Sequence, residues 1–172
     1  MTSSTPFAIC VMGVSGSGKT SIGEGLATLL GLHFLEGDQL HPPANVEKMS
    51  KGIPLTDEDR WPWLDAIGAE VAKSIDAGQG IVLSCSALKK AYRDRLRNAA
   101  HGKLAFVYLH GSRELLESRM GARKGHFMPT SLLDSQLKTL ENPTGEPGVL
   151  TVDIDATIGE IIQRATAALN AD

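Results

Sequence analysis

The chain has 172 residues, of which 42% are hydrophobic and 22% are charged, and its formal net charge is −3. This length indicates one domain, with a core large enough to need no disulfide bonds. The slightly acidic balance, without a basic block, excludes the usual charge signature of nucleic-acid or membrane-surface binding, so we expect neither partner.

The first residues, 1–6, carry no positive charge and no long apolar core, and the chain has no apolar run long enough to cross a membrane. Cys10 and Cys85 lie inside apolar runs, where a small buried side chain is the expected role of a cysteine. We therefore expect a cytoplasmic protein that is neither exported nor inserted into a membrane.

Apolar runs and helical patterns alternate along the chain, which indicates βαβ units and a parallel sheet covered on both faces. The first run, residues 7–12, leads into residues 13–20, GVSGSGKT, which fit the phosphate-binding loop G-x-x-x-x-G-K-[ST] at every fixed position. A helical pattern follows and stops at Gly31. A glycine-rich turn could fit by chance, but the strand before it and the helix after it favour a nucleoside triphosphate site.

The chemistry of this loop follows from its residue types. Its glycines allow successive backbone N–H groups to point at a phosphate, and the next helix adds the positive end of its dipole. Lys19 would reach the β- and γ-phosphates, and the Thr20 hydroxyl would bind Mg²⁺. The residues that we expect to bind the nucleotide here are Gly13, Ser15, Gly16, Ser17, Gly18, Lys19, Thr20 and Ser21.

Acidic side chains follow the short second strand, residues 33–36. Ligands of open α/β sheets gather outside the carboxyl ends of the strands. Glu36, Asp38 and His41 therefore arrive at the edge of the sheet where the phosphates must lie.

Two helices come next, a short one over 44–51 and a longer one from the N-cap Thr56 to Gly78. Both tryptophans, Trp61 and Trp63, belong to the longer helix. Packing in the core or under a lid explains them at least as well as contact with a ligand does.

The third strand, residues 81–85, continues into a basic segment that we expect to be helical from Ser86. Ser86, Lys89 and Arg93 could bind an anion there, and Lys89 and Arg93 would share one helical face. A solvated basic face explains the same residues equally well. A fourth strand follows over 104–109.

A helix over 112–123 leads into a Gly- and Pro-containing stretch, 124–129, that is typical of a mobile flap. Arg119 and Arg123 lie on one face of that helix. Phosphoryl transfer needs cations that close over the γ-phosphate and exclude water, so both arginines are candidates for nucleotide binding. The remaining expected elements are a helix over 130–140, a strand over 150–154 and a last helix that begins with the capping box Thr157 to Glu160.

The acids favour transfer of a phosphoryl group over hydrolysis. No apolar strand ends in the usual Mg²⁺-binding Asp, and Glu36 and Asp38 are the only acids well placed at a strand end. Asp38 could accept a proton from an attacking hydroxyl while Mg²⁺, Lys19 and the arginines stabilise the moving charge. The guanine-specific Asn-Lys-x-Asp signature is missing and the five histidines lack metal-ligand spacing, so we predict a small-molecule kinase without zinc.

Five further motifs follow the loop in a fixed order. They are Gly37-Asp38-x-x-His41-Pro42, Asn45-x-Glu47-Lys48-Met49, Asp57-x-Asp59-Arg60-x-Pro62-Trp63-Leu64, Cys85-Ser86-Ala87-Leu88-Lys89-x-x-Tyr92-Arg93-Asp94 and Glu117-Ser118-Arg119-x-x-x-Arg123-Lys124-Gly125-His126-Phe127. With the loop, they resemble the bacterial gluconokinase family over nearly the whole chain.

This resemblance implies an ATP:D-gluconate 6-phosphotransferase that uses ATP and Mg²⁺, commonly as a homodimer. It also implies a P-loop fold like that of nucleoside monophosphate kinases. That fold is a three-layer α/β/α single domain over 1–172, with five parallel strands in the order 2-3-1-4-5. A mobile lid around 119–130 and a substrate-side helical region around 40–77 complete it.

The resemblance also assigns roles to residues. Asp38 becomes the catalytic base, with Lys19 and Arg123 as the other catalytic residues; Arg119 lies near the adenine, and Arg123 reaches the phosphates. The candidates for binding gluconate are Asp38, His41, Arg60, Lys89, Arg93 and His126.

Thr20 and Glu36 are the expected Mg²⁺ ligands. Relatives often carry Asp-Gly-Asp where this chain has Glu36-Gly37-Asp38, so the longer Glu36 side chain reaches the metal directly or through water.

Other functions remain open from the residues alone. A pocket with Arg or Lys for a carboxylate and Asp or His for hydroxyls would also suit shikimate or another hydroxy acid. A nucleoside monophosphate kinase is less favoured, because a second nucleotide needs more aromatic and apolar surface. A nucleotide-binding regulator without turnover is disfavoured by Lys19, Asp38 and both flap arginines.

Overall fold

Five parallel strands form one sheet in the computed structural model, which describes residues 8–14, 16–122 and 130–170. The strands are β1 (Ala8–Met12), β2 (His33–Glu36), β3 (Ile81–Ser84), β4 (Leu104–His110) and β5 (Val149–Asp153), in the order β2-β3-β1-β4-β5. Every neighbouring pair is parallel. The expected sheet and its strand order are therefore confirmed.

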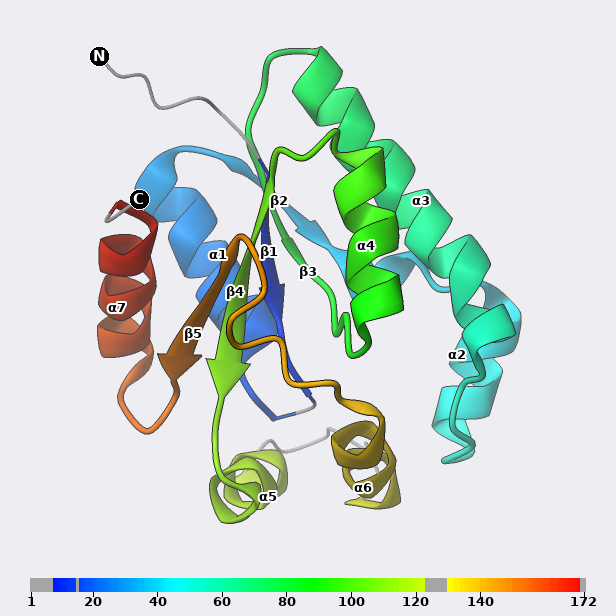
Figure 1. The fold of residues 1–172 in the computed structure, drawn as a ribbon. Helices are drawn as coiled ribbons and strands as arrows, with labels where there is room; N and C mark the ends of the chain where they lie inside the picture. The colour runs from blue at the N-terminus through cyan, green and yellow to red at the C-terminus, as the bar shows by residue number, and fades with distance from the viewer. Residues whose placement is uncertain (1–7, 15, 123–129, 171–172) are drawn as a thin grey trace.

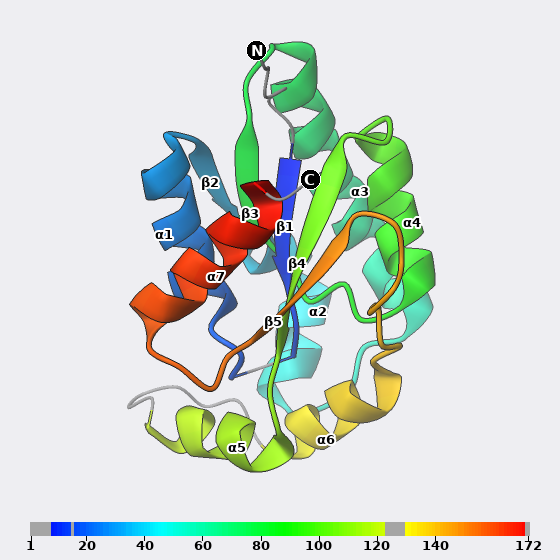
Figure 2. The same cartoon turned by 60° about the vertical axis from the view of Figure 1, so that its left-hand side comes forward.

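Helices cover both faces of the sheet, which gives the expected three layers (Figures 1 and 2). Helices α1 (Lys19–Leu30) and α7 (Ile158–Asn170) pack together on one face, and α3 (Asp57–Asp76) and α4 (Lys90–Ala99) pack on the other. The elements near the carboxyl ends of the strands are the 3₁₀ turn η1 (Gly37–Leu40), α2 (Pro43–Ser50), α5 (Arg113–Ala122) and α6 (Thr130–Thr139). Ligands of such folds bind at this end of the sheet.

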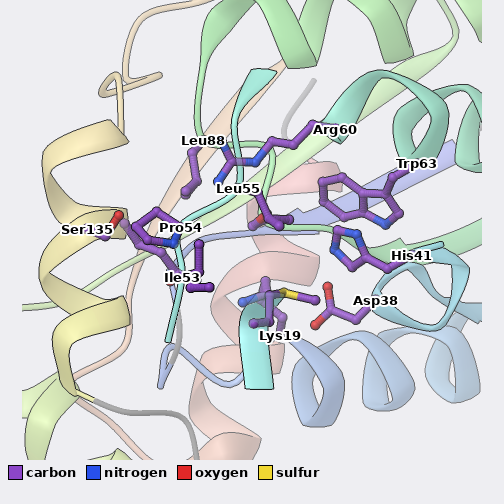
Figure 3. Close-up of a pocket in the computed structure, with 13 residues that line it drawn as sticks. Lys19, Asp38, His41, Ile53, Pro54, Leu55, Arg60, Trp63, Leu88 and Ser135 are labelled. Atoms are coloured by element: carbon purple, nitrogen blue, oxygen red, sulfur yellow. The ribbon is translucent and has the colours of Figure 1, made fainter. Parts of the chain in front are cut away.

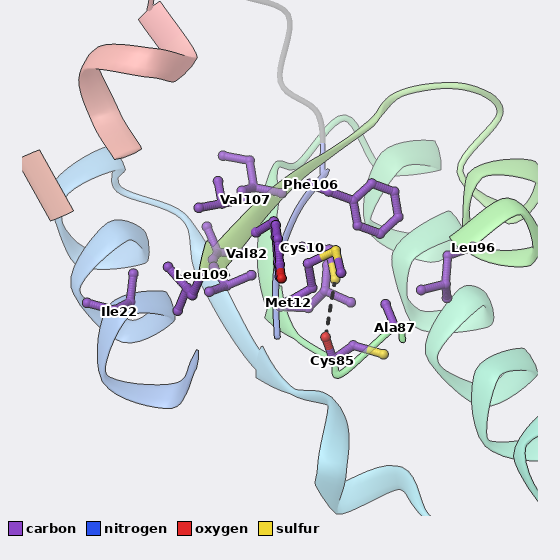
Figure 4. Close-up of a cluster of buried hydrophobic side chains, with 14 of the residues drawn as sticks. Cys10, Met12, Ile22, Val82, Cys85, Ala87, Leu96, Phe106, Val107 and Leu109 are labelled. Atoms are coloured by element: carbon purple, nitrogen blue, oxygen red, sulfur yellow. Dashed lines mark hydrogen bonds between the residues drawn. The ribbon is translucent and has the colours of Figure 1, made fainter. Parts of the chain in front are cut away.

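The core forms around β1, whose five residues are all buried. Ala8 pairs with Ile81 of β3 and with Leu104 of β4, so β1 is covered on both edges as well as on both faces. Figure 4 shows apolar side chains on the two faces of the sheet, with Ile22 of α1 on one side and Leu96 of α4 on the other. A strand buried in this way is typical of a parallel sheet between two helical layers.

Both cysteines are free and buried, as expected. Burial raises the pKa of the Cys10 thiol well above its ordinary value, and its Sγ donates to the Cys85 carbonyl oxygen (Figure 4). No helix in the described ranges is both long and apolar enough to cross a membrane.

The start of α4 differs from the expectation. The helix begins at Lys90 instead of Ser86, because Ala87 adopts a φ of +45°, which breaks a right-handed helix. Lys89 is the extended N-cap residue, so it does not share a helical face with Arg93. The expected pairing of these two residues on one basic face was therefore wrong.

Candidate active site

The phosphate-binding loop joins β1 to α1. Gly16 and Gly18 have φ values of +86° and +92°, which favour glycine, and Gly18 is the N-cap of α1. Gly18 has no side chain to cap the helix, so the first N–H groups of α1 remain open to an anion. Lys19 Nζ donates to the Val14 carbonyl oxygen at 3.2 Å, which folds the ammonium back over the loop. Ser15 lies outside the described residues.

Ser17 belongs to this loop and its side chain is completely buried. Within the described ranges, its Oγ is a buried polar side-chain atom that lacks a hydrogen-bond partner. A buried polar atom of this kind is costly unless a ligand or water supplies the partner.

Thr20 and Glu36, the two predicted Mg²⁺ ligands, lie within hydrogen-bond distance of each other. Thr20 Oγ1 donates to Glu36 Oε2 at 2.5 Å, and Ser84 Oγ donates to Glu36 Oε1, so both carboxylate oxygens are fixed. A hydroxyl and a carboxylate are oxygen ligands of the kind that Mg²⁺ takes together with nucleotide phosphates and water. In the described part of the chain, no group of three His, Cys, Asp or Glu side chains could hold a metal by itself. The donor set therefore fits a nucleotide-bound Mg²⁺.

Gly37 allows β2 and β3 to meet at this point. A Cβ on Gly37 would overlap the Ser84 carbonyl oxygen, which is backbone and cannot move aside easily. The Gly37 N–H donates to Ser84 Oγ at 3.3 Å, and the Gly37 carbonyl oxygen accepts from Trp63 Nε1 at 2.8 Å. Glycine between Glu36 and Asp38 thus lets two acids follow one strand end in close succession.

A pocket opens beside the loop at the carboxyl end of the sheet (Figure 3). Lys19 and Asp38 lie at one end of it, and Arg60 reaches from α3 toward Leu55 and Leu88 at the other end. The lining residues are Lys19, Asp38, His41, Met49, Ile53, Pro54, Leu55, Arg60, Trp63, Ser86, Leu88, Ser135 and Gln136. A few polar groups set among apolar walls are typical of a small-molecule site.

His41 is a neutral hydrogen-bond donor in this pocket. Its ring stacks on Trp63 with 4.0 Å between centroids. Asn45 Nδ2 donates to the Asp59 carbonyl oxygen at 2.9 Å and lies 3.1 Å from His41 Nδ1, so Nδ1 is the acceptor and the proton belongs on Nε2. Burial, and then the charge of Arg60, lower the pKa of His41 to about 4. The imidazole therefore offers an N–H at neutral pH and carries no charge.

The structure brings some predicted substrate residues together and separates others. Asp38, His41 and Arg60 all line the pocket. Lys89 is not among the lining residues, and its Nζ donates to Asp57 Oδ1 at 3.1 Å. His126 lies outside the described residues, as do Arg123 and most of the expected lid.

Arg93 corrects the sequence-based prediction. Its side chain is 0% exposed and is held by Glu146, at 2.6 Å, and by the carbonyl oxygens of Ala87 and Glu141. The ion pair lowers the pKa of Glu146. Arg93 therefore ties α4 to the segment before β5 and is not available to a substrate.

Arg119 lies next to the loop that follows β5. Its Nη2 donates to the Ile154 carbonyl oxygen at 2.6 Å and to the Ala156 carbonyl oxygen at 3.1 Å. These bonds place the guanidinium beside the start of α7.

Sequence reasoning missed most of the apolar lining. The sequence predicts only a break between two helices at Ile53, Pro54 and Leu55, yet these residues line the pocket. Ser135 and Gln136 come from α6, which is distant in sequence from the phosphate-binding loop. Their only signal was position in an element that follows the expected lid.

The fold and the site together define a P-loop kinase, with a phosphate-binding loop, a hydrogen-bonded hydroxyl and carboxylate beside it, and an acid in the lining of the neighbouring pocket. A family model described as "AAA domain" matches residues 9–143. The M. tuberculosis APS kinase CysC, at 18% identity and a TM-score of 0.72, shares the fold.

More similar relatives narrow the class. The gluconokinase of Gluconobacter oxydans is 50% identical, covering 94% of this chain and 93% of its own length. The thermoresistant gluconokinase of Escherichia coli is 45% identical, with 88% and 87% covered. A crystal structure of a gluconokinase from Sinorhizobium meliloti superposes with a TM-score of 0.91 at 55% identity, covering 98% of this chain and 94% of that one. This chain belongs to the gluconokinase family.

Proposed function

We propose that this protein transfers the γ-phosphoryl group of ATP to the 6-hydroxyl of D-gluconate. One observation carries the choice of acceptor: Lys19 and Asp38 lie at one end of the pocket, and the Arg60 guanidinium lies at the other (Figure 3). Gluconate is a linear acid with its carboxylate at one end and the reacting hydroxyl at the other, so it matches this polarity. The family's curated members, which bear the name gluconokinase, support the same acceptor.

The reaction follows from these positions. The acceptor hydroxyl oxygen attacks the γ-phosphorus, the bond to the β-phosphate oxygen of ATP breaks, and the hydroxyl proton passes to the Asp38 carboxylate. Lys19 and the open N–H groups of α1 stabilise the charge on the phosphates. Mg²⁺, when bound near Thr20 and Glu36, would neutralise charge on the β- and γ-phosphate oxygens.

The remaining pocket residues orient the acceptor. Arg60 binds the carboxylate through its N–H donors, and His41 donates its Nε2–H to a hydroxyl along the sugar chain. Arg119, held by the Ile154 and Ala156 carbonyls, is our candidate for contact with the adenine. Arg123 and His126 keep their expected roles as predictions, as do the homodimer and the cytoplasmic location.

A coupled ADP-release assay tests the function. It uses ATP and Mg²⁺ with a panel of gluconate, shikimate, other sugar acids, free sugars and nucleoside monophosphates. Turnover chiefly with gluconate supports the proposal. Turnover chiefly with shikimate or another acid would show that the protein is a kinase with a different acceptor. ATP binding without turnover of any acceptor would instead favour a regulator.

A further inference from the structure

The Arg60 guanidinium is held in place by Tyr92, a residue of α4 that does not line the pocket. Arg60 Nη1 donates to Tyr92 Oη at 2.8 Å, and its Cζ lies 5.2 Å from the centre of the Tyr92 ring. Tyr92 is only 1% exposed, and its ring packs edge-on against Trp61. Tyr92 therefore offers Arg60 an acceptor whose position is fixed by packing.

The direction of this hydrogen bond is set by Asp57. The Tyr92 hydroxyl donates to Asp57 Oδ1, which also accepts from Lys89 Nζ at 3.1 Å. A tyrosine hydroxyl has a single proton, so its donation to Asp57 leaves the oxygen free to accept from Arg60. The bonds from Tyr92 and Lys89 lower the pKa of Asp57, which is an anion at neutral pH.

Asp57 and Arg60 lie three residues apart on α3, a spacing at which opposite charges pair directly. In the structure they are instead connected through Tyr92 Oη. A direct ion pair would draw the guanidinium toward the start of α3 and cancel its charge. Arg60 would then be a weaker site for an anionic acceptor.

We propose that the Tyr92 hydroxyl acts as a spacer, which keeps Arg60 directed at the acceptor's carboxylate by holding it apart from Asp57. Tyr92 is in this sense a positioning residue, because it acts on the substrate only through Arg60. The inference rests on the proposed function, since it requires an acid acceptor at Arg60.

Variants of Tyr92 and Asp57 test this proposal. Tyr92→Phe removes one oxygen and keeps the packed ring. We expect its KM for gluconate to rise about tenfold, the scale of one lost polar contact to a charged group, while kcat and the KM for ATP stay near the wild-type values. Adding Asp57→Asn to Tyr92→Phe should return the KM for gluconate toward the wild-type value, because Arg60 then has no anion to pair with. Asp57→Asn alone is the fourth protein of this double-mutant cycle, together with the wild type.

Tyr108→Phe is the matched control, because Tyr108 is the chain's other tyrosine and is buried in β4, outside the pocket lining. It should leave both KM values unchanged, and circular dichroism checks that each variant is folded. An unchanged KM for gluconate in Tyr92→Phe overturns the inference. A double variant whose KM for gluconate is as high as that of Tyr92→Phe also overturns it. An equal rise in the KM for gluconate and the KM for ATP does so too, because it would indicate general structural damage.

The proposed function and this inference fail in different ways. If the wild-type protein does not phosphorylate gluconate, the proposed function is wrong and the inference falls with it. If the wild-type protein is active on gluconate and Tyr92→Phe matches it, only the inference is overturned.

Discussion

Thr20 Oγ1 and Glu36 Oε2 are joined by a 2.5 Å hydrogen bond across the gap between α1 and the end of β2. The acid that faces the phosphate-binding loop therefore comes from β2, whereas β3, the direct neighbour of β1, ends in Ser84. Ser84 has taken a supporting role, because its hydroxyl donates to the second oxygen of Glu36. The position of the Glu36 carboxylate thus depends on two strands, because β2 supplies the acid and β3 supplies the hydroxyl that anchors it.

Ser84→Ala should weaken the use of Mg²⁺. Loss of the anchor frees one carboxylate oxygen of Glu36, and removal of such a supporting partner typically costs at least about tenfold in metal affinity. Titration of ADP binding with Mg²⁺ should show this rise in the required Mg²⁺ concentration, while ADP binding without Mg²⁺ stays unchanged. Ser74→Ala, within α3, is the control. An unaltered Mg²⁺ dependence in Ser84→Ala would show that Glu36 needs no anchor.

Lys19→Ala should lower kcat by more than about 100-fold, the scale for loss of a group that stabilises charge in the transition state. Initial rates at saturating ATP and gluconate measure this directly. Lys73→Ala removes an exposed lysine of α3 and should leave kcat unchanged. A mild effect of Lys19→Ala would show that the phosphate-binding loop does not stabilise the transition state.

His41 should make the protein less stable in acid. Its pKa is lowered from 6.5 to about 4 in the folded state, so between these pH values the unfolded chain binds a proton that the folded chain does not. The free energy of unfolding therefore falls as the pH drops from 6.5 toward 4, and below that range the effect of His41 is constant. Urea unfolding at several pH values should show a shallower fall in His41→Gln. Equal slopes in the two proteins would place His41 in a more solvated position.

Glu146→Ala should destabilise the fold without affecting the acceptor site. Removal of the partner leaves the fully buried Arg93 charge uncompensated, which costs about 3 kcal/mol or more in the free energy of unfolding. Glu47→Ala breaks an exposed pair with Lys51 and should cost less than about 1 kcal/mol. Urea unfolding separates the two cases. A higher KM for gluconate in folded Glu146→Ala protein would make Arg93 a candidate for gluconate binding again.

The sequence predicted the architecture well, because the signals for it are local. The phosphate-binding loop fits at every fixed position, and the predicted N-cap at Thr56 and capping box at Thr157 both form their hydrogen bonds. Apolar runs that are buried on both faces gave the parallel sheet, and the family resemblance gave its strand order. Except for the strand order, each of these features depends on residues close together in the chain.

The site was predicted only in part, because burial and partners are set by contacts between distant segments. Arg93 and Arg60 look alike in a sequence, as arginines in predicted helices. Arg93 meets Glu146 from the segment before β5, and Arg60 meets Tyr92 at the start of α4 and faces a pocket. Neither partner has a spacing that a pattern can reveal. The positive φ of Ala87, which moved the start of α4, has no propensity signal either.

The central place of β1 in the sheet also has a consequence for synthesis of the chain. This strand is translated before both of its neighbours, which begin only at Ile81 and Leu104. The phosphate-binding loop is attached to β1, so it acquires a fixed support only after β4 has left the ribosome. Nascent chains that stop before β4 should therefore be unable to bind ATP, and until then the apolar β1 is exposed to aggregation or to chaperones.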